Sequence, residues 1–235
     1  LRNGGFESGV RTALQAILAS PRFLFRLEKA PPDTQPGDSY RISDFDLASR
    51  LSYFLWATAP DDELISVASQ GLLQEPDVLE LQVRRMLADP HAESLSTKFA
   101  VQWLRLSDLE KIDPDFLIYP QYDALLAQAM RRETELFFDS VVREDRSVFD
   151  LLTADHTFVN ERLASHYGFP DVSGHEFSRV VWHNENRRGL LGHGSILTLT
   201  SIADRTSAVQ RGKWVMEVLF GTPPPPPPPN VPELE

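Results

Sequence analysis

"AMRRETELFFDSVVRED", residues 129–145, is the stretch that decides the fold of this chain. With the residues just before it, it places apolar side chains at helical spacing on one face: Leu126, Met130, Phe137 and Val141. Glu133 lies in the middle of that face. An ionised carboxylate among apolar side chains must be paired with a charge, hydrogen-bonded or protonated. The role of Glu133 is therefore the first question that the sequence poses.

Two hypotheses explain Glu133. In the first, an arginine from another helix forms a buried ion pair with it, and the candidates are Arg50, Arg188 and Arg211. In the second, burial raises the pKa of Glu133, and the carboxyl acts as a general acid or base. The sequence favours the ion pair, because a shifted pKa alone does not identify a catalytic residue.

The composition excludes several classes of function. The 235 residues include no cysteine, which rules out disulfides, thiolate metal sites and cysteine nucleophiles. The formal net charge of −11 argues against a nucleic-acid partner, since nucleic acids favour basic surfaces. No apolar run reaches the roughly 18–20 residues of a membrane span, so none is expected. The chain starts without methionine or a signal-peptide core, and we interpret it as a piece of a longer protein.

Helical periodicity dominates the chain. Apolar residues repeat at helical spacing within residues 6–30, where Pro21 predicts a kink or two abutting helices. Ser43 is a suitable N-cap for the next helix, and residues 153–168 are expected to form a short helix that ends near Gly168. Only residues 175–186 are typical of extended structure. The sequence thus predicts a mainly α protein with a multi-helix, bundle-like globular fold.

Three segments are predicted along the chain. An N-terminal helical subdomain covers residues 1–115 and a C-terminal one covers residues 116–221, because the irregular stretch KIDPDFLIYP at 111–120 separates two groups of helices. Residues 222–235 include seven consecutive prolines and are expected to form an exposed polyproline II tail or linker.

Further polar residues are candidates for a site. His166 is expected on the inward side of its helix, and we interpret it as a satisfied core histidine, with catalysis as the alternative. Asp155 and Asn160 fit capping or turn positions, and Asp155 is also a candidate catalytic residue. His156, Glu161 and His166 are five residues apart, so they lie on different helical faces and predict no metal site.

The sequence GHGSILTLTS at residues 192–201 resembles part of a nucleophile turn. Its spacing does not fit the G-x-S-x-G elbow, because His193 and Leu197 occupy the two glycine positions around Ser195. We interpret the small residues as sites of close helix packing. The alternative is Ser195 as a nucleophile, with His166 or His193 as its base.

Positive charge gathers in the same part of the chain: Arg187, Arg188, Arg205, Arg211 and Lys213. These side chains either neutralise carboxylates and helix ends or form an anion-binding or partner-docking patch. With Asn160, Arg188 and Arg211 make up a predicted ligand or ion-pair network.

Three long stretches resemble a known family. They cover residues 5–26, 131–168 and 187–232, and the last one runs from RRGLLGHGSIL into the polyproline segment. They are similar to domains of unknown function that accompany c-type cytochrome modules in large secreted proteins of planctomycetes and related bacteria. The resemblance covers nearly the whole chain, and its final segment is specific.

This resemblance implies neighbours and a location. In that family a haem-attachment CxxCH typically follows soon after the polyproline. Covalent haem c is therefore expected in neighbouring regions of the parent protein, with no cofactor within this chain. The resemblance also implies haem-bearing domains as partners and export to the periplasm or cell surface. It supplies no catalytic residues.

Two functions are consistent with these residues. The first, which we favour, is a helical scaffold or interaction module without catalysis of its own, which positions haem domains or binds a polysaccharide or protein partner. The second is an extracellular hydrolase of glycosidic or ester bonds. In that case Glu133 is the general acid or base, or Ser195 acts with a histidine.

Overall fold

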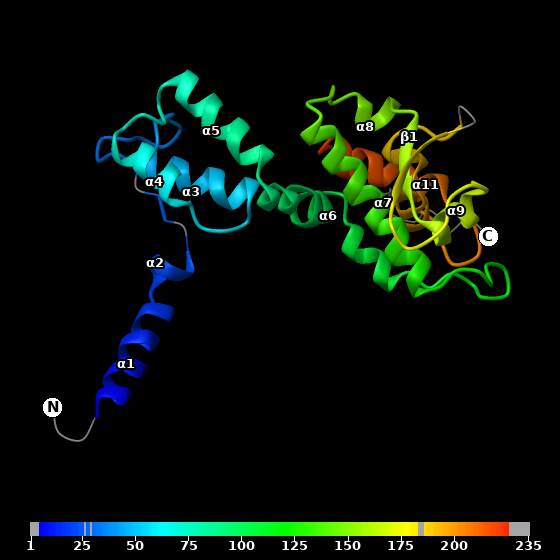
Figure 1. Ribbon diagram of the computed structural model, residues 1–235, viewed down its shortest axis with the longest axis horizontal. Helices are drawn as coiled ribbons and strands as arrows, with labels where there is room; N and C mark the ends of the chain where they lie inside the picture. Colours follow the sequence, from blue (N-terminus) through cyan, green and yellow to red (C-terminus); the bar gives the residue numbers. More distant parts are fainter. Residues whose placement is uncertain (1–4, 26, 29, 183–185, 226–235) are drawn as a thin grey trace. The chain divides into compact units, whose positions relative to one another are not determined.

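The structure is a computed structural model that describes residues 5–25, 27–28, 30–182 and 186–225 (Figure 1). These residues form eleven α-helices and one two-stranded sheet, so the prediction of a mainly α protein is confirmed. None of the helices in the described ranges combines the length and the apolar composition of a membrane span. The chain divides into two compact units, Leu1–Met86 and Leu87–Glu235.

The first unit is a set of short helices. They are α1 (Phe6–Leu18), α2 (Pro21–Leu24), α3 (Asp44–Leu55), α4 (Asp62–Ser69) and α5 (Pro76–Ala88), of which the residues up to Met86 belong to this unit. The break predicted at Pro21 is confirmed, because α1 ends before the proline and α2 begins at it. Ser43 caps α3 as predicted, since its hydroxyl accepts the backbone N–H of Asp46.

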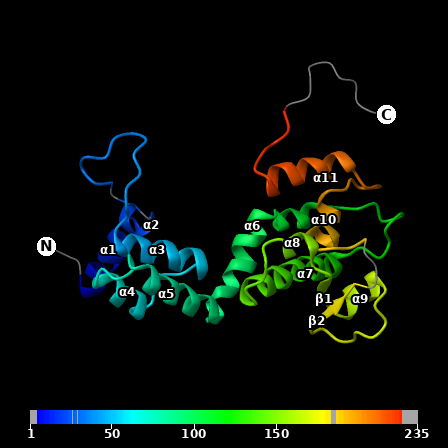
Figure 2. The same ribbon diagram turned by 90° about the horizontal axis from the view of Figure 1, so that it is seen from above.

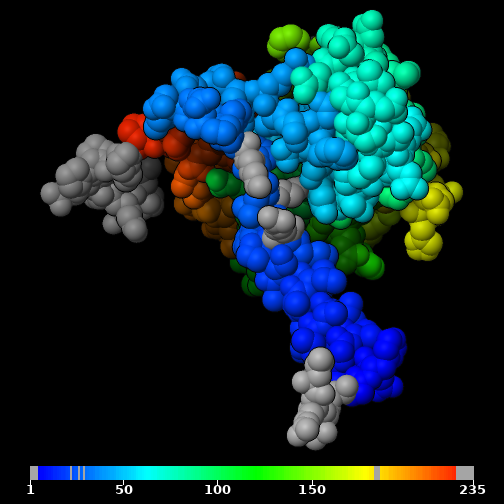
Figure 3. All heavy atoms as spheres, turned by 90° about the vertical axis from the view of Figure 1, so that its left-hand side faces the viewer, coloured from blue at the N-terminus to red at the C-terminus, as the bar shows by residue number. Residues whose placement is uncertain are grey.

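The core of the first unit joins α3, α4 and α5. Leu64, Leu73 and Met86 are fully buried there. The carboxylate of Asp44 accepts the backbone N–H of Leu73 at 2.8 Å, and the indole of Trp56 donates to the carbonyl of Met86 at 2.8 Å. The atoms of these helices lie together on the face seen in Figure 3, where they are light blue to cyan.

The second unit carries the longest helix and the sheet. Its α-helices are α6 (Val101–Trp103), α7 (Ala124–Arg143), α8 (Asp150–Thr153), α9 (Glu161–Tyr167), α10 (Gly194–Leu199) and α11 (Ala208–Trp214). Its strands are β1 (His156–Val159) and β2 (Ser178–Val181). Short 3-10 or π-helical turns complete it: η1 (Pro90–Glu93), η2 (Leu95–Ala100), η3 (Leu106–Lys111), η4 (Leu190–Gly192) and η5 (Val215–Leu219).

Helix α7 is the central element of the second unit. In Figure 2 it lies between α10 on one side and β1, β2 and α9 on the other, and it contacts β1, α9 and α10. The carboxylate of Asp123 caps its first turn by accepting the N–H of Leu126 at 2.7 Å. The predicted apolar face is buried as expected: Leu126, Met130, Phe137 and Val141 are all buried.

A two-stranded sheet replaces part of a predicted helix. The sequence predicts a helix over residues 153–168, but β1 forms at residues 156–159 and pairs antiparallel with β2, inside the segment 175–186 predicted as extended. The run HTFV is rich in β-branched and aromatic residues, which favour a strand when a partner strand is present. Helix α9 begins only after Asn160 and ends as predicted at Gly168, which adopts a φ of 82°.

The compact units differ from the predicted subdomains. The sequence places a boundary after residue 115, whereas the two units divide after Met86. The connection around residue 115 belongs to the second unit, because the N–H of Asp115 donates to the carbonyl of Ala203 at 2.8 Å and η3 packs against α10. From residue 226 onward, the predicted polyproline II tail lies outside the described residues.

Candidate functional site

Glu133 is the centre of a buried hydrogen-bond network. Its side chain is 0% exposed. The hydroxyl of Thr157 on β1 donates to Oε1 at 2.6 Å, and the phenol of Tyr167 at the end of α9 donates to Oε2 at 2.7 Å. The Tyr167 oxygen in turn accepts the backbone N–H of Gly194 at 2.7 Å. These four residues, here called the Glu133 network, join α7, β1, α9 and α10.

Gly194 allows the close approach on which this network depends. A Cβ at this position would lie 2.6 Å from the Tyr167 oxygen and 3.0 Å from the side chain of Met130. A larger residue would push the phenol away from the carboxyl. The prediction that small residues in the GHGS stretch serve close packing is therefore confirmed at Gly194.

Burial raises the pKa of Glu133 from the usual 4.5 to about 7. The hydrogen bonds from Thr157 and Tyr167, and the positive charge of Arg187, act in the opposite direction without outweighing desolvation. Burial and the neighbouring carboxyl raise the pKa of the Tyr167 phenol well above its usual value, so the phenol keeps its proton as a donor. The Glu133 carboxyl therefore gains and loses a proton near neutral pH within the protein core.

The ion pair that the sequence favours for Glu133 is wrong. Among the described residues, no ion pair includes this carboxyl, because hydroxyl donors from β1 and α9 occupy both of its oxygens. Arg50 lies in the first unit and pairs with Glu28 there. Arg211 donates to the hydroxyl of Thr200 at 3.3 Å. No described contact joins Arg188 to the Glu133 network.

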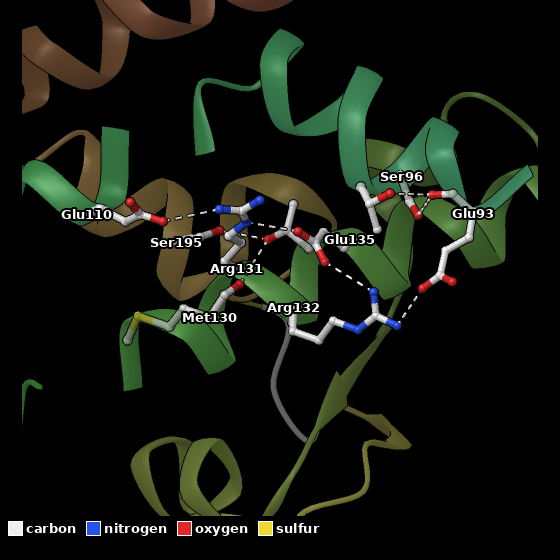
Figure 4. Close-up of polar contacts among 10 residues, drawn as sticks. Glu93, Ser96, Glu110, Met130, Arg131, Arg132, Glu135 and Ser195 are labelled. Atoms are coloured by element: carbon white, nitrogen blue, oxygen red, sulfur yellow. Dashed lines mark hydrogen bonds and ion pairs between the residues drawn. The ribbon is translucent and has the colours of Figure 1, made fainter. Parts of the chain in front are cut away.

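The other buried carboxylate of α7, Glu135, does have arginine partners. Arg131 and Arg132 contact its two oxygens at 2.9 and 3.1 Å, and Glu135 lies between them in Figure 4. The same arginines reach Glu110 and Glu93. The pairs with Glu135 form between residues three or four apart, which the helix itself brings together. Glu135 is thus paired within its own helix, whereas Glu133 is held by residues far away along the chain.

Thr134 connects α7 to the start of α10. Its hydroxyl lies 3.0 Å from Nδ1 of His193 and 2.7 Å from the hydroxyl of Ser195. All three side chains are 0% exposed. Burial lowers the pKa of His193 to about 3, and nearby positive charge adds to the effect, so this imidazole is neutral. The three side chains form a second buried polar cluster beside the Glu133 network.

The predicted catalytic residues do not come together. The described hydrogen bonds of Ser195 do not include a histidine, because the hydroxyl of Thr134 bonds to both Ser195 and His193. His166 is exposed on α9 rather than inward-facing as expected, since α9 starts only after β1 and turns Leu163 into the core. Asp155 is exposed just before β1.

Asn160 has the capping role that its position predicts. Its side chain accepts the N–H of Leu163 at 3.0 Å at the start of α9. No described contact brings it together with Arg188 or Arg211, although the sequence predicts one network for the three. Within the part of the chain that the structure describes, no group of three histidine, aspartate or glutamate side chains could hold a metal ion.

Sequence reasoning missed the three hydroxyls around Glu133 and His193: Thr134, Thr157 and Tyr167. Thr157 and Tyr167 are 24 and 34 residues from Glu133 along the chain. Hydroxyl side chains are also common at protein surfaces, so no local pattern marks them. The one local pattern that could have indicated Thr157 is the strand propensity of HTFV, because a strand there orients its side chain.

The raised pKa of Glu133 predicts a pH-dependent stability. An unfolded chain releases this proton near pH 4.5, whereas the folded core holds it up to about pH 7. The folded state binds more protons between these values, so the contribution to the free energy of unfolding falls as the pH rises through this range. The full loss is about 3 kcal/mol at about 1.4 kcal/mol per pKa unit. Denaturant unfolding at a series of pH values should show this decline in the wild type and not in Glu133→Gln.

The matched control is Glu110→Gln, whose side chain is 77% exposed and outside the Glu133 network. This variant should keep the wild-type decline. A free energy of unfolding that stays level across this pH range, relative to Glu133→Gln, would show a carboxyl whose pKa is not raised on folding and would contradict the prediction.

Gly194→Ala tests the close contact at the start of α10. The added methyl group displaces the Tyr167 phenol, and we expect the free energy of unfolding to fall by about 1–3 kcal/mol, the usual cost of overpacking a core. Gly212→Ala in α11 is the matched control, because a Cβ there meets nothing within 4 Å. Alanine should be neutral or stabilising by up to about 1 kcal/mol at that helical position. Equal denaturant midpoints for the two variants would contradict the tight contact.

Comparison with known proteins places these residues in two matched segments. Residues 42–169, more than half of the chain, match the family described as "PSD4: Protein of unknown function (DUF1592)". Residues 187–235 match "PSCyt3: Protein of unknown function (DUF1588)". No curated protein and no solved structure matches the chain. Glu133, Thr157 and Tyr167 lie in the first segment and Gly194 in the second, so the Glu133 network spans both. The chain belongs to the DUF1592 family of proteins of unknown function.

Proposed function

We propose that this chain is a helical scaffold or interaction module, without catalysis of its own, in a secreted, cytochrome-associated multidomain protein. The observation that supports it best is the burial of its reactive groups. The side chains of Glu133, Thr134, His193 and Ser195 are fully buried, and each is hydrogen-bonded to a neighbouring element. A catalytic group must reach a substrate, whereas a buried polar network holds helices in one arrangement.

The proposed partners are haem-bearing domains of the same parent protein. The short name PSCyt3 of the second matched family suggests a cytochrome association, in agreement with the resemblance to domains that accompany c-type cytochromes. This chain has no cysteine, so in this proposal covalent haem c is attached in neighbouring regions. The parent protein is then exported to the periplasm or cell surface.

Co-elution tests the partner. The chain is mixed with a separately produced haem-bearing part of the parent protein and run on size-exclusion chromatography. We expect the haem absorbance to elute earlier with the chain than without it, because a scaffold forms a complex with the domain that it positions. Unchanged elution over a range of concentrations up to about 100 μM would contradict the scaffold role at that domain.

A hydrolase screen tests the absence of catalysis. We expect the purified chain to show no turnover of model esters or polysaccharides above buffer, because Ser195 and Glu133 present no atom at the surface. Turnover that a folded Ser195→Ala variant loses would contradict the proposal and identify an ester hydrolase. Loss in a folded Glu133→Gln variant would instead identify glycosidic chemistry. Thermal melts establish that each variant is folded.

A further inference from the structure

A pocket of about 210 Å³ lies beside the Glu133 network in the second unit. Met130 of α7 and residues of α10 that include Gly194 form part of its wall. The connection before α7, the end of α9, Arg187 and the loop after α10 contribute the rest. Among the described lining residues there is no aspartate or glutamate, whereas Arg187 and His166 both face the space. The pocket therefore differs in charge from the chain as a whole, whose net charge is −11.

Arg187 is held in a fixed plane at this pocket. Its guanidinium carbon lies 4.6 Å from the ring centre of Tyr167 and 5.3 Å from that of Trp182. One nitrogen donates to the carbonyl of Gly192 at 3.2 Å. In the described part of the chain, the guanidinium forms no ion pair, although it carries five N–H donors. Its remaining donors are thus pre-organised for a planar anion, which a guanidinium binds in a two-pronged fashion.

Tyr122 adds a second polar group to the same wall. Its hydroxyl oxygen is buried, and among the described residues it has no hydrogen-bond partner. The ring packs against the apolar cluster that includes Leu126 and Met130, so it is held in place. A buried hydroxyl without a partner is unfavourable, and a ligand oxygen in the pocket would supply that partner.

The rest of the lining limits the kind of anion. Partial desolvation at the pocket and nearby arginines lower the pKa of His166, so at neutral pH Arg187 is the one fixed positive charge among the described lining residues. Ile112, Leu197 and Ile202 provide apolar wall, which an inorganic ion would leave unused. The volume equals roughly seven water molecules at about 30 Å³ each, which is enough for one small ring. These features fit one negative charge on an apolar body.

We propose that this pocket binds a small organic monocarboxylate. The guanidinium of Arg187 takes the carboxylate, the hydroxyl of Tyr122 donates to the same ligand, and the apolar wall holds its body. This inference goes beyond the scaffold role, because it gives the second unit a ligand of its own. It does not require catalysis, since neither Glu133 nor Ser195 is among the described lining residues of the pocket.

Isothermal titration calorimetry of the whole chain with sodium benzoate tests the proposal. We expect saturable binding with a Kd of about 1 mM or tighter, a reasonable value for so small a ligand. Benzamide has the same shape without the charge and should bind at least about tenfold more weakly. Inorganic phosphate should also bind more weakly than benzoate, because it leaves the apolar wall empty.

Three variants locate the site. Arg187→Gln should weaken benzoate binding by about tenfold or more, and Tyr122→Phe by about threefold. Arg205→Gln is the matched charge control, because that arginine is 68% exposed and does not line the pocket. Its benzoate affinity should equal that of the wild type. Tyr122→Phe removes a hydroxyl that bonds nothing in the described chain, so this variant still decides the question if Arg187→Gln does not fold.

Several results would overturn the proposal. No saturable binding of benzoate, up to about ten times the expected Kd, would show that the pocket is not such a site. Equal affinity for benzamide, or tighter binding of phosphate, would refute an organic monocarboxylate. Unchanged benzoate affinity in Tyr122→Phe, or an equal loss in Arg205→Gln, would place any binding elsewhere on the chain.

Discussion

The second unit depends on two hydroxyl hydrogen bonds to the buried carboxyl of Glu133. They connect residues 24 and 34 positions apart and so join β1 and α9 to α7. The bond from Gly194 to Tyr167 then adds α10. A buried hydroxyl that loses its acceptor destabilises the fold by about 1–3 kcal/mol. Displacing any one of these elements therefore also lowers the stability of the elements bonded to it. Glu133 and the phenol of Tyr167 together therefore join the four elements.

Helix α7 shows two ways to bury a carboxylate. Glu135 is neutralised by arginines of its own helix, which keeps both charges near the surface, since Arg131 and Arg132 remain partly exposed. Glu133 lies too deep for such a pair, because a second charge would also have to be desolvated. Hydroxyl donors avoid the desolvation of a second charge, but they stabilise the negative charge of the carboxylate less than an arginine does. The shifted pKa of Glu133 follows from this choice.

Local patterns were enough to predict the mainly α fold and the burial of Glu133. The apolar spacing in residues 126–141, the cap at Ser43 and the helix end at Gly168 are decided by residues a few positions apart. The partners of Glu133 could not be predicted in this way, because Thr157 becomes inward-facing only once β1 pairs with β2. Read as part of one continuous helix, the same segment also puts His166 on the wrong face.

The site was foreseen in part for the same reason. Ser195 and His193 share a partner, as the sequence could not show: the hydroxyl of Thr134, from another element, bonds to each of them. The pocket beside Arg187 needed four separate segments to come together, and the short-range sequence showed only a cluster of positive charge. Long-range packing decides both features.

Hydrogen exchange at the backbone N–H of Gly194 reports on this packing in the unsubstituted protein. Because the Tyr167 oxygen accepts this N–H at 2.7 Å, its hydrogen can exchange with solvent only when the phenol moves away. The slow replacement of that hydrogen by deuterium therefore reports the free energy of opening the four elements at their junction. The peak of this amide in a two-dimensional NMR spectrum thus reports whether the core around Glu133 is closed.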